Sequence, residues 1–495
     1  MKTRIFLSLA IIATALAACK KDFLDKAPLD SVNTSNYYKT PADAIAAVNA
    51  AYQPLQRPKL YNFRMWTSDI FAGNSEVGGA NDGSDGIETI QEANFVTKTD
   101  NAGVLDLYRG PAPGILQCNL VLQKVPAINM DAALKERVLG EAKFLRGLYY
   151  FILVRYFGDV PLILAPQEPG SPDLFPKRTP KDQVYTQIIQ DFTDAMNQLP
   201  LASTYTGADI GRASKGAATG MLAKVYLTMG QYQKAADLCS QVAAMGYSLN
   251  ADYADNFNPL KKNTSESLFE VQYSGATTYG FFDDLNQASW ASTFTGPRNQ
   301  TNFVAGAYGW DLPTQEFVDS YETGDKRKDE TILYSGCPKF NGQDYNASYS
   351  LTGYNLRKFL VPTTVSAVYN TNPEDFPVLR YADVLLMQAE ALNELGQTSS
   401  AEAPLNLVRR RAGLPNIATG LSKDDFRTAV LHERRMELAF EGQRWFDLIR
   451  INNGRYGLDF LHSIGKTNAT DKNLLMPIPQ QEIDANPNLT QNAGY

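Results

Sequence analysis

Residues 220–246 read GMLAKVYLTMGQYQKAADLCSQVAAMG, a stretch in which small and large residues are spaced around a central glycine. Small side chains at Ala223, Ala235 and Ala236 allow two helices to approach closely, and Gly230 allows the chain to reverse between them. This spacing is typical of a tetratricopeptide-like (TPR-like) pair of antiparallel helices. The stretch therefore predicts a helical scaffold as the basis of the fold.

A second TPR-like pair is expected from Tyr381 to Gly413, where small and apolar residues recur with the same spacing. Two or three such pairs are too few for an open solenoid, so we expect them to pack against the rest of the chain. Apolar periodicity and proline or glycine boundaries, such as Thr40-Pro41 at the start of the first, predict further helices at residues 42–56, 134–157, 181–199 and 424–451. The fold class is predicted as mainly α.

Two long stretches, residues 57–113 and 252–380, differ from this scaffold. They are rich in Gly, Asn, Asp, Thr, Tyr and Trp and show little helical periodicity. Long irregular segments within a compact protein often carry function. We therefore expect a helical frame on which these stretches build an irregular, aromatic ligand face.

The composition limits the chemistry that the chain can perform. It has 495 residues and a formal net charge of −7, with 26 Tyr, 24 Phe and 4 Trp beside only 2 His and 4 Cys. Without a basic block, no nucleic-acid partner is expected. Cys118, Cys239 and Cys337 form no C-x-x-C pair and are predicted to be small core residues. No metal site, cofactor or catalytic residue is predicted.

The N-terminus has the pattern of an export signal. Residues 1–18 combine a short basic start with an apolar run that is too short to span a bilayer. The run ends in Leu16-Ala17-Ala18-Cys19, which resembles a bacterial lipobox, so Cys19 is predicted to become a lipidated N-terminus. The alternative is an ordinary Ala-x-Ala cleavage beside an incidental cysteine. Lipidation would tether the domain to a membrane.

Four stretches of the chain carry a family resemblance. They are LRGLYYFILVRYFGDVPLI (145–163), RYADVLLMQAEALNELG (380–396), HERRMELAFEGQRWFDLIR (432–450) and MPIPQQEIDANPNLTQNAGY (476–495). Together with Phe23-Leu24-Asp25 shortly after Cys19 and the TPR-like pairs, they resemble the SusD/RagB family and occur in the order of that family's motifs.

The resemblance implies a SusD-like fold with an N-terminal part at 19–250 and a C-terminal part at 251–495. It implies a lipid-anchored outer-membrane protein that faces the cell exterior and is not an enzyme. Such proteins bind nutrients, usually oligosaccharides, and lie over a SusC-type TonB-dependent transporter. Related members take peptides instead.

Candidate ligand residues lie in the two irregular stretches. The C–H face of a sugar ring packs on an aromatic ring, while its hydroxyls need polar partners. The resemblance indicates the region in which ligand residues lie but not which residues they are. Each Trp could instead belong to the core. The predicted set is Trp66, Asp69, Asn74, Trp290, Arg298, Tyr308 and Trp310, with Tyr279 and Phe281 as weaker candidates.

Three alternatives stay open at this point. The ligand could be a peptide, although Trp290 and Trp310 beside Arg298 favour a sugar. The carboxylates of residues 433–447 could serve a glycosidase, but the arginines that alternate with them favour an ion-paired scaffold, with Trp445 in the core. Residues 81–92 approach the spacing of a calcium loop that would end at Glu92, although an ordinary loop fits better.

Overall fold

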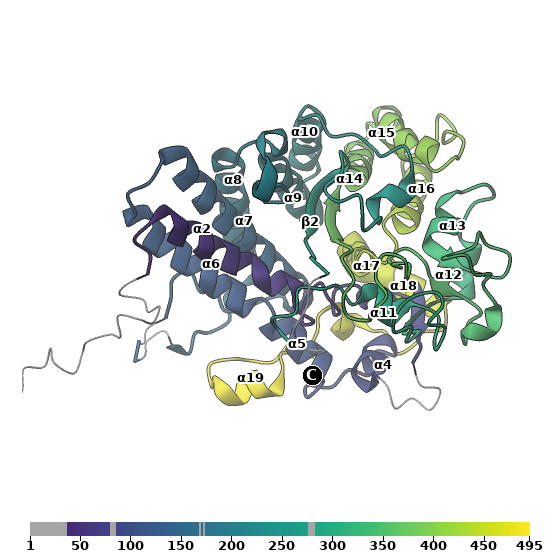
Figure 1. Ribbon diagram of the computed structural model, residues 1–495, viewed down its shortest axis with the longest axis horizontal. Helices are drawn as coiled ribbons and strands as arrows, with labels where there is room; N and C mark the ends of the chain where they lie inside the picture. The colour runs from purple at the N-terminus through teal and green to yellow at the C-terminus, as the bar shows by residue number, and fades with distance from the viewer. Residues whose placement is uncertain (1–36, 80–85, 168–169, 172–173, 276–282) are drawn as a thin grey trace, which may run out of the picture.

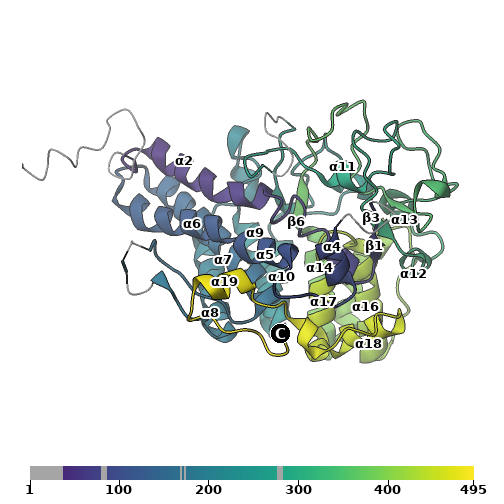
Figure 2. The ribbon, with the colours of Figure 1, turned by 90° about the horizontal axis from the view of Figure 1, so that it is seen from below.

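The computed structural model describes residues 37–79, 86–167, 170–171, 174–275 and 283–495. The predicted signal at 1–18, Cys19, Tyr279 and Phe281 lie outside these residues. The long helices of the N-terminal part gather at one end of the molecule, while the loops with short helices lie toward the other end, beside helices of the C-terminal part, as both views show (Figures 1 and 2). The mainly α prediction is confirmed.

Four long helices form the first part of the frame, and α7 lies at its centre. Helix α7 packs against the other three, and its second half is almost wholly buried. Thr40 caps the first of them with a capping box, as the Thr40-Pro41 pair predicts. The helices are α2 (Pro41–Tyr52), α6 (Ala112–Lys124), α7 (Ala132–Phe157) and α8 (Lys181–Gln198).

Both TPR-like pairs are present, and they pack against each other through α10 and α14. Each pair reverses at a glycine with positive φ, 69° at Gly230 and 78° at Gly396, a conformation that glycine adopts without strain. The prediction from residues 220–246 is therefore confirmed. The pairs are α9 (Lys215–Thr228) with α10 (Tyr232–Ala243), and α14 (Tyr381–Glu394) with α15 (Thr398–Arg411).

The single helix predicted at 424–451 is wrong, because the chain breaks between α16 (Lys423–Glu437) and α17 (Arg444–Arg450). In the break, Phe440 and Gly442 have φ values of 64° and 69°. Their backbone N–H groups donate to the buried carboxylate of Asp69, at 3.1 and 3.3 Å. A tertiary contact with a distant segment therefore ends the helix, and local periodicity does not reveal it.

The irregular stretches contain more structure than their sequences indicate. Three short two-stranded antiparallel sheets occur among the described residues: β1 (Ser75–Val77) with β3 (Asp311–Pro313), β2 (Ser267–Val271) with β6 (Phe376–Arg380), and β4 (Ile332–Leu333) with β5 (Asn355–Leu356). The β1–β3 pair joins one irregular stretch to the other. The short helices are α3 (Ser68–Phe71), α4 (Ile87–Ala93), α5 (Ala102–Arg109), α11 (Ala291–Thr295), α12 (Gln315–Asp319) and α13 (Arg327–Thr331). Two more, α18 (Arg455–Ser463) and α19 (Gln480–Ala485), lie near the C-terminus.

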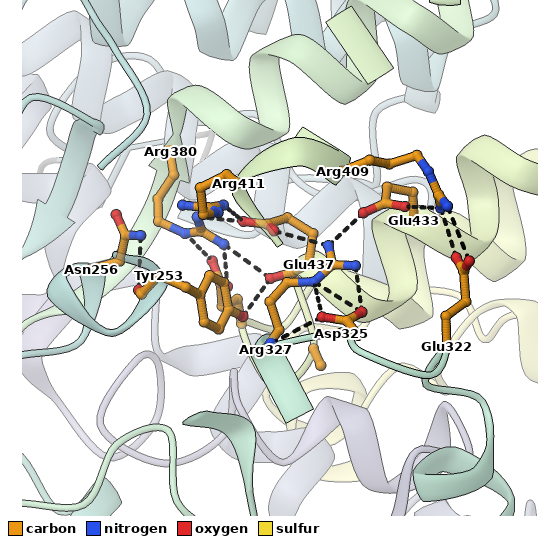
Figure 3. A network of polar contacts seen from close by, with 12 residues as sticks. Tyr253, Asn256, Glu322, Asp325, Arg327, Arg380, Arg409, Arg411, Glu433 and Glu437 are labelled. Carbon is orange, nitrogen blue, oxygen red and sulfur yellow. Dashed lines mark hydrogen bonds and ion pairs between the residues drawn. The ribbon is translucent and has the colours of Figure 1, made fainter. Parts of the chain in front are cut away.

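A network of buried ion pairs fixes the loop-rich part to α16 (Figure 3). Glu437 accepts from Arg327 at 3.1 Å and from Arg380 at 2.9 Å, and it also pairs with Arg411. Glu433 accepts from Arg409 at 3.0 Å. Burial alone would raise the pKa of Glu437, but the three guanidinium groups around it lower that pKa to about 2. The segment is ion-paired, as predicted, but the partners of Glu433 and Glu437 come from other segments and not from the arginines that alternate with them in sequence.

The hydrophobic core runs through the helical frame, with a smaller cluster around Phe303, Leu333 and Tyr345 under the loops. Cys118, Cys239 and Cys337 are buried, as predicted, and all three are free, while Trp445 is a core residue with 3% of its surface exposed. Among the helices of the described residues, none combines the length and the apolar composition needed to cross a bilayer.

Candidate functional site

The three candidate tryptophans lie together in one aromatic cluster built from both irregular stretches. The ring of Phe63 lies 5.1 Å from those of Trp66, Phe294 and Trp310, and Trp290 lies 5.9 Å from Phe294. Their exposed fractions are only 1% for Trp66, 0% for Trp290 and 7% for Trp310. In this structure the three indoles are packing residues, and contact with a ligand stays a prediction for them.

Asp69 and Asn74 are also buried, and both hold the chain in place. The Asn74 amide donates to Asp69 at 2.7 Å, while its oxygen accepts from Arg435 at 2.8 Å. With the bonds from residues 440 and 442, these contacts attach α3 and the residue before β1 to α16 and to the segment after it. Burial raises the pKa of Asp69 to about 6. The structure thus shows both side chains in structural contacts.

Tyr308 and Arg298 lie at the surface beside the aromatic cluster. Tyr308 is 39% exposed, its ring centre lies 5.6 Å from that of Phe294, and its backbone oxygen accepts from Arg298 at 3.0 Å. Tyr369, which is 52% exposed, lies nearby because both tyrosines flank Gly306 and Thr293. Two tyrosines from distant positions therefore reach solvent on the same part of the loop-rich face.

A cavity of about 310 Å³ lies close to Tyr308, because Arg298, which donates to the Tyr308 carbonyl, and the next residue, Gly309, both line it. Its floor includes the chain around Gly78, where Gly79 N–H donates to Gly309 O at 3.0 Å. A Cβ atom on Gly78 would lie 1.8 Å from Gly309 O, so only glycine fits there. The lining residues are Gly78, Gly79, Arg298, Asn299, Gln300, Gly309, Leu312, Ser348, Tyr349, Ser350 and Leu351.

The cavity offers groups that bind hydroxyls and carbonyls. Two side-chain amides, two serine hydroxyls, a guanidinium and backbone groups can donate or accept hydrogen bonds. Its described lining contains no Asp or Glu, whereas glycoside hydrolysis needs a pair of carboxylates across the substrate. The geometry fits reversible recognition of a polar molecule with flat apolar faces.

The calcium-like spacing at residues 81–92 gains no support from the described residues. Positions 81–85 lie outside them, while Glu92 is 4% exposed and packs beside Gly103 and Arg64. Burial raises the pKa of Glu92 to about 7. Within the described part of the chain, no group of three or more His, Cys, Asp or Glu side chains is placed to hold a metal ion.

Sequence reasoning did not single out Tyr369, Asn299, Gln300, Ser348 or Ser350. All five fall inside the predicted ligand segment 252–380, so the region was indicated but the residues were not. Their composition is that of ordinary loops. Exposure and mutual proximity distinguish them, and both depend on the folded chain.

A helical-repeat frame thus carries a loop-built face with a polar cavity. The chain belongs to the SusD family. Two family matches support this assignment. The family described as "SusD family" matches residues 246–495, and the family described as "Starch-binding associating with outer membrane" matches residues 22–227.

Individual relatives agree with this assignment. SusD-like protein P2 of Formosa agariphila is 28% identical, with 98% of each chain covered. The starch-binding protein SusD of Bacteroides thetaiotaomicron is 25% identical over 77% of this chain and 76% of its own. A solved laminarin-binding SusD-like protein superposes with a TM-score of 0.79 and 31% identity, with 92% of this chain and 100% of the other covered.

Proposed function

We propose that the chain is a cell-surface lipoprotein that captures an oligosaccharide nutrient and passes it to a SusC-type TonB-dependent transporter in the outer membrane. The observation that carries the ligand face is the polar cavity close to the exposed Tyr308. A laminarin-binding structural neighbour and a starch-binding relative support a glycan as the ligand class. The chain acts as a binder and not as an enzyme.

In this proposal, the two tyrosine rings stack on sugar rings at the mouth of the cavity. Arg298, Asn299 and Gln300 bind the hydroxyls on one side, and Ser348 and Ser350 bind them on the other. The tryptophans behind them fix Tyr308 through Phe294. Contact of a sugar with Trp310 itself would require the cluster to open, since that side chain is 7% exposed.

Membrane attachment and transfer complete the proposal. Cys19 carries the lipid after residues 1–18 are removed, which places the mature chain on the outer membrane with its ligand face outward. Parts 19–250 and 251–495 act together, and the TPR-like helices α9, α10, α14 and α15 provide a broad surface for the transporter. A peptide remains the alternative ligand, and a surface glycosidase the remote alternative.

A binding screen on the mature chain tests the proposal. Laminarin and starch oligosaccharides and mixed peptides would be titrated by calorimetry, and the glycan samples would be checked for new reducing ends. We expect saturable glycan binding without product. Tyr308→Ala and Arg298→Ala should weaken it, while Leu407→Ala, an exposed residue of the scaffold helix α15, serves as the control. Saturable peptide binding alone would favour the alternative, and reducing ends formed at enzymatic rates would overturn the binder.

A further inference from the structure

Arg155, in the last turn of α7, is a buried cation with an unusual environment. It is 8% exposed, and its guanidinium lies 4.0 Å from the ring centre of Phe151 and 3.7 Å from that of Phe446. Its Nε donates to Phe151 O at 3.1 Å, and no described carboxylate lies within ion-pair distance of it. Burial lowers the pKa of Arg155. The two terminal nitrogens therefore have no acceptor among the described residues.

The charges packed around Arg155 do not neutralise it, because each nearby carboxylate already has other partners. Asp383 accepts from Lys224 at 2.7 Å and from Arg434 at 2.8 Å. Asp447 accepts from Arg434 at 2.9 Å and Arg450 at 2.8 Å, and Glu390 accepts from Arg450 at 2.7 Å. With Arg155 this cluster holds four cations against three carboxylates: Arg155, Lys224, Arg434 and Arg450 against Asp383, Glu390 and Asp447.

The unbalanced charge lies at a cavity of about 520 Å³ between α7, α8, α9 and α17. Arg155 and Phe446 line this cavity, which shares no residue with the one beside Tyr308. Its size suits a small molecule. Its other polar or charged lining residues are Lys181, Asp182, Tyr185, Thr228, Arg450, Asn453 and Asp471, of which Lys181, Asp182, Asn453 and Asp471 are exposed.

We propose that this cavity is a second ligand site that binds a small oxyanion, with the Arg155 guanidinium as its principal partner. A buried charge without a counter-ion is costly, and a bound anion would remove that cost. The planar fork of an arginine matches a carboxylate through two parallel hydrogen bonds, and the flanking rings hold that fork in one orientation.

The exposed charges at the cavity refine the choice of anion. Lys181 adds a positive charge, but Asp182 and Asp471 oppose it. Solvent screens these exposed groups more strongly than the buried Arg155. A singly charged carboxylate is therefore favoured over a phosphate dianion. The chemical class that fits is a small monocarboxylate, such as a sugar acid. This site stands independently of the glycan face.

Titration of the mature chain with four probes at constant ionic strength tests the proposal. D-glucuronate and acetate carry one carboxylate, inorganic phosphate carries more charge, and glucose carries none. We expect saturable binding of glucuronate, at least tenfold weaker binding of phosphate, and no binding of glucose. Failure of the wild-type chain to saturate with either carboxylate would overturn the proposal. Tighter binding of phosphate than of glucuronate would overturn the assignment to carboxylates.

Two variants locate the site by different routes. Arg155→Lys keeps the charge and removes the fork, and it should weaken glucuronate binding at least tenfold. Met229→Trp fills the cavity from the C-cap of α9 and leaves Arg155 intact, so it tests the site even where the first variant folds poorly. Arg455→Gln, an exposed position on α18, is the control. If Met229→Trp and a folded Arg155→Lys both bind glucuronate like the parent, the proposed site is wrong.

Discussion

Replacing Glu437 by Gln tests whether the buried ion network holds the loop-rich part of the molecule to its helical frame. Glu437 is fully buried and accepts hydrogen bonds from Arg327 and Arg380 while also pairing with Arg411 (Figure 3). The amide keeps the volume of the side chain and removes the negative charge. The guanidinium groups of Arg327, Arg380 and Arg411 would then have one carboxylate fewer to pair with, in a site from which water is excluded.

Two estimates of the cost agree. Breaking a buried ion pair by removing one partner costs about 3–5 kcal/mol of unfolding free energy. Independently, the pKa of Glu437 falls from 4.5 in its ordinary state to about 2 in the folded chain. At about 1.4 kcal/mol per pKa unit, that difference corresponds to about 3 kcal/mol. Because the folded-state pKa is the lower one, this stabilisation is present above pH 4.5 and is lost as the pH falls toward 2.

Urea unfolding followed by circular dichroism, at pH 7.5 and at steps down to pH 3, measures both effects. We expect Glu437→Gln to lower the unfolding free energy by about 3 kcal/mol at pH 7.5, with a smaller difference from the parent at pH 3. Glu136→Gln, an exposed position on α7, should change it by less than about 0.5 kcal/mol. Equal stability of the two variants at pH 7.5 would refute the argument, and so would a difference that does not change with pH.

Four further substitutions test the face and its support. Tyr308→Ala and Tyr369→Ala should each weaken glycan binding about two- to tenfold in calorimetry, since each removes one exposed stacking ring. Unchanged affinity in both variants would show that the ligand binds at another place. Gly78→Ala should weaken glycan binding and lower the melting temperature, because the new Cβ would collide with Gly309 O and separate β1 from β3. A melting curve like that of the parent would contradict this packing. Trp290→Ala should lower the unfolding free energy by about 3–5 kcal/mol in urea, as expected for a large core side chain. A loss of glycan affinity with no loss of stability would instead identify Trp290 as a ligand residue.

The scaffold could be predicted from the sequence because its determinants are local. Apolar spacing, Thr40-Pro41 and the turns at Gly230 and Gly396 act over a few residues, and the helices that they predict are present. The break after Glu437 could not be predicted in this way. Its cause is Asp69, which is distant in sequence and accepts hydrogen bonds from the two residues that leave the helix. Periodicity contains no information about such a partner.

The candidate site was predicted as a region and not as a set of side chains. Tryptophan is favoured both in binding faces and in cores, so residue type alone could not separate these two roles for Trp66, Trp290 and Trp310. Folding places Trp66 and Trp290 at or below 1% exposure and leaves Tyr308 and Tyr369 at the surface. Tyr369 comes close to Tyr308 only because the chain brings both to Gly306.

The ion network also bears on how the face recognises a ligand. A loop that is mobile before binding loses conformational entropy when a ligand orders it, and this loss opposes binding. Here Arg327, Lys358 and Arg380, all within the irregular stretch 252–380, bind carboxylates of residues 433–441 while they are buried. The β1–β3 pair fixes the second irregular stretch to the first. The loops around the cavity are therefore held before any ligand arrives, and a glycan that fits them would bind at a lower entropic cost than one captured by unanchored loops.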